Sequence, residues 1–90
     1  SLKHRELDFY ASKLFITPKY LSKVILAESG RTARNWICLR VLLEARMLLK
    51  ERRLTIQQIS DRLNFPNQSF FGSFFKRAVG VSPSEYRSKN

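Results

Sequence analysis

The fold is decided by residues 54–87, which read LTIQQISDRLNFPNQSFFGSFFKRAVGVSPSEYR. Thr55-Ile56-Gln57-Gln58 has the pattern of a capping box, in which two side chains satisfy main-chain N–H groups at a helix start. Asn67 provides a second N-cap after a proline, and Gly80 stands where a helix ends. Ser82-Pro83-Ser84-Glu85 is another capping box, with proline at the first helical position. The stretch therefore predicts three short helices, at 56–63, 68–79 and after Pro83.

The same start and stop signals divide the rest of the chain. Thr17-Pro18 predicts a helix start, and Gly30 predicts its end. Helices are predicted at 5–15, at 18–29 and, as one long helix, at 33–52. There is no sustained period-two alternation and no Asn-Gly or Asp-Gly hairpin turn, so the sequence predicts an all-α fold.

The chain also repeats itself. Leu21-Ser22-Lys23-Val24-Ile25 followed by Gly30 matches Phe71-Gly72-Ser73-Phe74-Phe75 followed by Gly80. Upstream, Ala11-x-x-Leu14 matches Ser60-x-x-Leu63, and the second copy has one extra residue in its turn. Each copy is a helix, a tight turn and a second helix, which is the helix-turn-helix unit. The predicted organisation is a first helix-turn-helix at 1–30, a central linker helix at 31–53 and a second helix-turn-helix at 54–90.

Composition restricts the function. The 90 residues suit a single small domain, and 17 Lys+Arg against 7 Asp+Glu give a net charge of +10, which favours a polyanionic partner. With 43% hydrophobic residues the chain is too apolar for a disordered basic tail. One cysteine and one histidine supply neither a disulfide framework nor a structural zinc site, and no apolar run suits a membrane span. Neither a catalytic constellation nor a glycine-rich phosphate loop is present, so we expect no enzyme, no metal and no cofactor.

The helix after Thr17-Pro18 carries the first candidate site. Leu21, Val24 and Ile25, with Tyr20 in part, form the stripe expected to be buried. The other face carries Lys19, Ser22 and Lys23 near the helix start, where a reading helix meets base edges. Lysine can donate to guanine and serine can donate or accept. The alternative is that the two lysines form an ordinary solvated face.

The second copy carries a matching candidate site. Its core stripe is Phe71, Phe74 and Phe75, and Lys76 and Arg77 lie further along, within reach of phosphates. Phe70 lies one position off this stripe, where it either packs against the neighbouring helix or touches thymine methyl groups; packing is the preferred interpretation. The face expected to meet bases holds Gln68, Ser69, Gly72 and Ser73.

The long helix is apolar around more than half its surface, which predicts packing on both sides. About 20 residues span ~30 Å. Since one duplex turn is ~34 Å, such a helix could place two reading helices in successive major-groove segments. Arg40 is expected to contact phosphate or a buried acidic partner, and Arg46 to pair with an acidic partner such as Asp61; a surface position is the alternative for both. The predicted phosphate contacts are Thr17, Arg31, Arg34, Arg40, Asn67, Lys76 and Arg77, and Arg52 and Arg53 are further candidates.

These residues carry a family resemblance. Residues 54–87, with Phe75-Lys76, Gly80-Val81-Ser82-Pro83 and Tyr86-Arg87, resemble the C-terminal signature of the AraC/XylS family, and the first copy and the linker follow the same pattern. The resemblance implies a bipartite DNA-binding domain whose contact positions are those named above. It also implies a first helix, of which this sequence would retain only Leu2–His4. Ser73 stands where the family commonly has arginine, Gly72 where it has a hydroxyl residue, and Asn64 where it has glycine in the turn. Because asparagine tolerates the left-handed conformation, the change at Asn64 should leave the fold intact.

The resemblance implies a function and partners. It indicates sequence-specific binding of double-stranded DNA as part of a bacterial transcription regulator, in the cytoplasm at the nucleoid. RNA polymerase and an N-terminal sensing or dimerisation region of the parent chain are the further partners it implies. The alternative is an interaction module whose basic surface holds RNA or polymerase without reading sequence; an enzyme ranks third, and a membrane-surface helix ranks below it.

Overall fold

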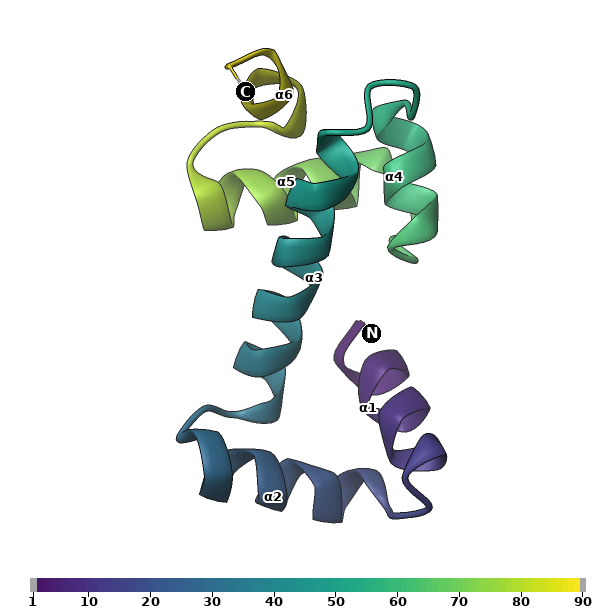
Figure 1. Ribbon diagram of the computed structural model, residues 1–90, viewed down its shortest axis with the longest axis vertical. Helices are drawn as coiled ribbons and strands as arrows, with labels where there is room; N and C mark the ends of the chain where they lie inside the picture. The colour runs from purple at the N-terminus through teal and green to yellow at the C-terminus, as the bar shows by residue number, and fades with distance from the viewer. Residues whose placement is uncertain (1, 90) are drawn as a thin grey trace. The chain divides into compact units, whose positions relative to one another are not determined.

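The computed structural model describes the backbone of residues 2–89 and the side chains of residues 6–89. The all-α prediction is confirmed, because the described part of the chain consists of helices and their connections, with no strand. None of these helices is long and apolar enough to cross a membrane. Figure 1 shows the helices α1 (Leu2–Lys13), α2 (Pro18–Ser29), α3 (Ala33–Leu49), α4 (Ile56–Arg62), α5 (Gln68–Val79) and α6 (Pro83–Lys89).

The predicted caps explain where the helices start. The Oγ1 of Thr17 accepts from the N–H of Tyr20 at 3.1 Å, and the Oδ1 of Asn67 accepts from that of Phe70 at 3.0 Å. The predicted box at Thr55 is present with both of its hydrogen bonds. In the box at 82–85, the two residues at its ends exchange two bonds of 3.1 Å. Local capping chemistry therefore sets these starts.

Three helix boundaries differ from the prediction by more than one residue. The first helix runs over Leu2–Lys13 rather than 5–15, so Leu2–His4 continue α1 and do not form a separate helix. It stops early because Phe15 adopts the left-handed conformation, with a φ of 58°. The helix α3 stops at Leu49 rather than 52.

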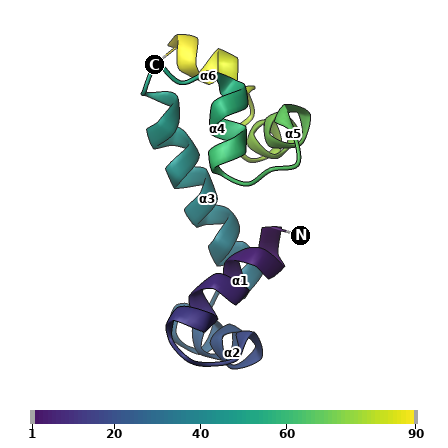
Figure 2. The same ribbon diagram turned by 90° about the vertical axis from the view of Figure 1, so that its right-hand side faces the viewer.

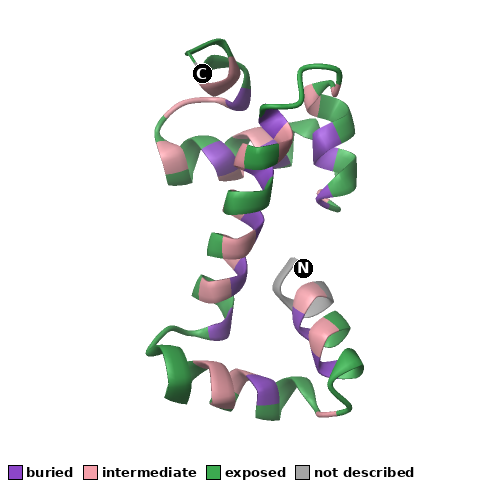
Figure 3. Ribbon diagram, in the orientation of Figure 1, coloured by how far each residue is buried: buried purple, intermediate pink, exposed green. Residues whose placement is uncertain are grey.

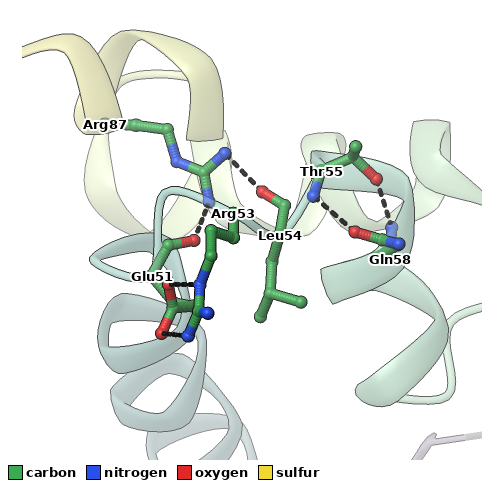
Figure 4. A network of polar contacts seen from close by, with 6 residues as sticks. All are labelled: Glu51, Arg53, Leu54, Thr55, Gln58 and Arg87. Atoms are coloured by element: carbon green, nitrogen blue, oxygen red, sulfur yellow. Dashed lines mark hydrogen bonds and ion pairs between the residues drawn. The ribbon is translucent and has the colours of Figure 1, made fainter.

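Main-chain carbonyl groups at and after the end of α3 accept hydrogen bonds from a side chain far along the chain. The guanidinium of Arg87 on α6 donates to the carbonyl oxygens of Leu49 (2.9 Å), Glu51 (3.2 Å) and Leu54 (2.7 Å). Figure 4 shows the bonds to Glu51 and Leu54. Carbonyl groups at the end of α3 and just after it have no partner within the helix. One side chain, that of Arg87, thus supplies their hydrogen bonds.

The chain divides into two compact units, Ser1–Arg40 and Val41–Asn90, which share α3. In the first unit α1 packs against α2 (Figure 1), and both helices carry buried positions (Figure 3). Tyr10 packs edge-on to Trp36, with ring centroids 6.3 Å apart. The buried apolar residues of this unit are Leu7, Ala11, Leu21, Ala33 and Ile37.

In the second unit α5 packs against both α4 and α6 (Figure 2). Phe71 and Phe75 are fully buried, and their ring centroids lie 6.0 Å apart. The half-buried Phe74 packs against Phe65 at 5.3 Å, so the predicted phenylalanine stripe does form a core. Tyr86 closes the cluster from α6, with its ring 5.4 Å from that of Phe75.

The long helix is less buried than its composition predicts. Its buried residues recur at every fourth position, as Ala33, Ile37, Val41, Ala45 and Leu49. Leu39, Leu43 and Met47 are 40%, 54% and 72% exposed, so the prediction of packing on both sides is wrong for these residues. Asp61, the example given as a partner for Arg46, instead accepts from Gln57 at 2.9 Å, and the buried Nε of Arg46 has no hydrogen-bond partner among the described residues.

Candidate nucleic-acid interface

The turns of the two helix-turn-helix units share the same backbone conformation. Phe15 and Asn64, at matching places in the repeat, have φ of 58° and 65°. The next N–H in each turn bonds back to the first helix, from Ile16 to the Ala11 carbonyl at 3.0 Å and from Phe65 to the Ser60 carbonyl at 3.1 Å. The expectation that asparagine tolerates the left-handed conformation is confirmed. The sequence did not predict that a phenylalanine, 95% exposed, adopts it as well.

The start of α2 exposes two of the three residues on this helix that are predicted to meet bases. Lys19 and Lys23 are exposed, and Ser22 is half-buried. The helix is held from its other side by Leu21, which is 9% exposed. Tyr20 was expected to be partly buried, but it is 57% exposed and belongs to the open side. The proline at the first helical position favours a helix start here. Its ring fixes a helical φ, and it lacks the N–H that would have no partner in the first turn.

The start of α5 has the same arrangement. Gln68, Ser69 and Ser73 are exposed, and Gly72 is half-buried, like Ser22 at the matching position of α2. A Cβ atom built on Gly72 would meet nothing within 4 Å, so that face of the helix is open. Phe70 is 59% exposed, and the preferred interpretation that it packs against a neighbouring helix is wrong.

The predicted phosphate contacts fall into two groups. Most are exposed at helix starts or near helix ends: Thr17, Arg31, Arg34, Asn67, Lys76 and Arg77. The Arg31 guanidinium donates to Asn35 at 2.9 Å, which fixes it beside the first turn of α3. Arg40 is half-buried instead; it forms an ion pair with Glu6 at 3.1 Å and lies over the Tyr10 ring at 5.0 Å. This is the acidic partner that the sequence left open for Arg40.

Two carboxylates have perturbed acidity. The Arg53 side chain, followed by its main-chain N–H, lowers the pKa of Glu51 (Figure 4). The Ser82 main-chain N–H, followed by its hydroxyl, lowers the pKa of Glu85. Both are structural pairs outside α2 and α5. Among the described residues, no group of three or more His, Cys, Asp or Glu side chains could hold a metal ion.

The chain is similar to known proteins along most of its length. Residues 10–89 match a family model described as a helix-turn-helix domain. The arabinose operon regulatory protein of Salmonella typhimurium is 27% identical over 85 residues, which are 94% of this chain and 30% of that protein. The chain spans 26% to 30% of the length of the first curated relatives it matches.

Solved structures give the same result. The C-terminal domain of AraT, a response regulator from Geobacillus stearothermophilus, superposes with a TM-score of 0.78 at 33% identity, covering 93% of this chain and 69% of that one. The DNA-binding domain of AdpA, solved with a target DNA, has a TM-score of 0.73 at 20% identity and shares the fold, covering 88% of this chain and 71% of that one. The chain belongs to the AraC/XylS family of helix-turn-helix domains.

Proposed function

We propose that this domain binds double-stranded DNA in a sequence-specific manner, as the DNA-binding part of a bacterial transcription regulator. The observation that carries the proposal is the repeated reading helix. Both α2 and α5 start at a side-chain cap, bury one apolar side and leave the opposite side of the first two turns open. A net charge of +10 supports a polyanionic partner. The AdpA domain, which has the same fold, was solved with DNA.

In this proposal α2 makes the more specific contacts. Lys19 and Lys23 lie four residues apart on the open side of the helix and are exposed. Each ammonium group can donate to the O6 and N7 acceptors of a guanine in the major groove. Ser22 is half-buried, so its hydroxyl group lies nearer the helix surface than the lysine ammonium groups. It can donate to or accept from a base edge that comes close to the helix.

The second helix, α5, reads the adjacent groove segment in this proposal. Gln68 can bond the N6 and N7 positions of adenine, and Ser69 and Ser73 can donate or accept. Gly72 lets the helix backbone come close to the bases, since nothing occupies the space beside it. Few of these side chains fix one base by themselves, so the polar contacts of α5 discriminate less than those of α2.

Phosphate contacts supply most of the affinity in this scheme. Arg31, Arg34, Lys76 and Arg77 are exposed, and the N-cap residues Thr17 and Asn67 stand beside helix starts that favour an anion. Each phosphate neutralised adds ~0.9 to the slope of log affinity against log salt on B-form DNA. The four cationic contacts then give a slope of about 3.6, which weakens binding by between three and four orders of magnitude over a tenfold rise in salt.

The test begins with selection of bound sites from a random duplex library, followed by competition with random duplex and single strands at physiological salt. On the selected site, Lys19→Ala and Lys23→Ala should each cost about 1–3 kcal/mol and relax discrimination at one position. Lys89→Ala, on the exposed surface of α6, is the matched control. Discrimination that survives both substitutions in α2 contradicts the assignment of this helix. Equal binding to specific and random duplex contradicts sequence reading as a whole.

Footprinting on the same site tests the two-segment arrangement. Two protected segments about 10 base pairs apart are expected, since that is the repeat of the major groove on one side of B-form DNA. A sensing or dimerisation region in the parent chain and contact with RNA polymerase are further parts of the proposal. The further region is supported by the length of the curated relatives, of which this chain spans less than a third, whereas the contact with RNA polymerase rests on the family resemblance alone.

A further inference from the structure

Phe70 is a large apolar side chain exposed on a helix otherwise packed by phenylalanines. It is 59% exposed, whereas Phe71 and Phe75 on the same helix are fully buried. Phe65, Phe71, Phe74 and Phe75 make ring contacts with one another, and none of the ring contacts among the described residues includes Phe70. Its ring therefore contributes little to the core of the unit.

The capping geometry places Phe70 in the first turn of α5. Its N–H donates to the Oδ1 of the N-cap residue Asn67 at 3.0 Å. Helical spacing puts Phe70 on the same side as Ser73 and Arg77, three and seven residues further on, and both of these are exposed. The ring also lies four residues before the half-buried Phe74, so it stands where the buried stripe of α5 borders the open side, and 59% of it is exposed there.

The first helix-turn-helix repeats this feature. Tyr20 precedes the buried Leu21 as Phe70 precedes the buried Phe71, and its N–H bonds to the N-cap Thr17 at 3.1 Å. The Tyr20 side chain is 57% exposed, nearly the same fraction as that of Phe70. An exposed aromatic residue at one place in both copies is a feature of the reading helices and not an accident of one turn.

We propose that Phe70 contacts the C5 methyl group of a thymine in the groove segment that α5 faces. This inference rests on the proposed function. The thymine methyl is the apolar group on the major-groove edges of the four bases, and a phenyl ring has no hydrogen bond to offer the polar groups beside it. The neighbours of Phe70 on α5 discriminate poorly between bases by hydrogen bonding, since they are Ser69, Gly72 and Ser73. The phenyl ring therefore adds a preference for thymine that these neighbours do not supply. Tyr20 carries a hydroxyl group and can also bond a polar edge or a phosphate.

The test removes the methyl group from the DNA and the ring from the protein. On the selected duplex, each thymine is replaced in turn by deoxyuridine, which differs only in the methyl group. Parent protein should lose about fourfold in affinity at one position in the segment assigned to α5, the factor for burying one methyl group. Phe70→Ala should bind the thymine duplex more weakly and should bind the thymine and deoxyuridine duplexes equally. Phe70→Leu, which keeps an apolar side chain, should retain part of the preference.

Met47→Ala removes another exposed apolar side chain, 72% exposed on α3, and should retain the full preference for thymine. Two outcomes overturn the role of Phe70 while leaving specific DNA binding intact. In one, the affinity of the parent protein does not change with deoxyuridine at any position; in the other, Phe70→Ala loses as much affinity on that replacement as the parent protein does. Tighter binding to one strand alone than to the duplex indicates base stacking and overturns it too. Equal binding of the parent protein to selected and random duplex overturns both this inference and the proposed function.

Discussion

The Nε of Arg87 donates to the carbonyl oxygen of Leu49, the last residue of α3, at 2.9 Å. The same guanidinium reaches the carbonyls of Glu51 and Leu54 in the connection that follows the helix (Figure 4), so one side chain satisfies three acceptors in all. Helix ends leave carbonyl groups without intrahelical partners. Arg87 therefore fixes the path between α3 and α4 from a helix that lies more than thirty residues further along the chain.

Replacing Arg87 by lysine should destabilise the unit Val41–Asn90. A single ammonium group cannot reproduce the fork of a guanidinium, so at least one carbonyl loses its partner. We expect a loss of about 2 kcal/mol in the free energy of unfolding, measured by urea titration with circular dichroism. Lys89→Ala, in the same helix and exposed, should change it little. Equal stability of Arg87→Lys and the parent protein would show that the three bonds contribute nothing.

Replacing Phe15 by asparagine should stabilise the domain. Phe15 has a φ of 58° and is 95% exposed, so its ring gains little from burial while its backbone is strained. Asparagine stands at the matching place, Asn64, with a φ of 65°. We expect a gain of about 1 kcal/mol in thermal or urea unfolding. Phe15→Ala removes the ring but not the strain, and a similar gain in that variant would contradict the explanation.

The parts of the fold that local chemistry controls could be predicted from the sequence. The boundaries of α2 and α5 agree with the predicted ranges because a side-chain cap starts each helix and a glycine ends it. Gly30 and Gly80 adopt the left-handed conformation at φ of 73° and 97°, which glycine does at little cost. Lys19 and Lys23 are exposed as predicted, because Leu21 sets which side of α2 is buried.

Features that depend on partners distant in the chain could not be predicted in this way. The ion pair of Arg40 with Glu6 joins residues 34 positions apart, and nothing in the sequence pattern around Glu6 indicated that it would be the partner of Arg40. Helical spacing placed Tyr20 in part on the buried stripe, and packing against a neighbouring helix was the preferred interpretation for Phe70. Both are exposed, because exposure depends on what packs beside a residue. The exposed apolar residues of α3 were misjudged for the same reason.

Replacing Ser60 by alanine should stabilise the second unit. Ser60 is fully buried, and its Oγ has no hydrogen-bond partner among the described residues. Ala11 occupies the matching place in the first copy and is 1% exposed. Burying a hydroxyl group without a partner costs about 1–3 kcal/mol.

Ser60→Ala should therefore raise the free energy of unfolding by about 1 kcal/mol. The reciprocal change, Ala11→Ser, should lower it by a comparable amount in the first unit. Urea unfolding of both variants measures the two effects against one parent. A loss of stability in Ser60→Ala would mean that the hydroxyl group has a partner in solution.

Replacing Glu85 by glutamine should reduce the dependence of stability on pH. The Ser82 N–H donates to the Glu85 carboxylate at 3.1 Å and lowers its pKa below the ordinary value of 4.5. A carboxyl group with a lower pKa in the folded state stabilises the fold above pH 4.5, and this contribution is lost as the pH falls through the folded-state pKa. Glutamine can accept the same bond without titrating.

The melting temperature of Glu85→Gln should therefore fall less than that of the parent protein between pH 6 and pH 3. The other capping box provides a reciprocal control, because there Gln58 accepts from the Thr55 N–H at 2.8 Å without a charge. Gln58→Glu should add the dependence on pH that Glu85→Gln removes. Parallel melting curves for Glu85→Gln and the parent protein across this range would show that the Ser82 contacts do not favour the ionised carboxylate.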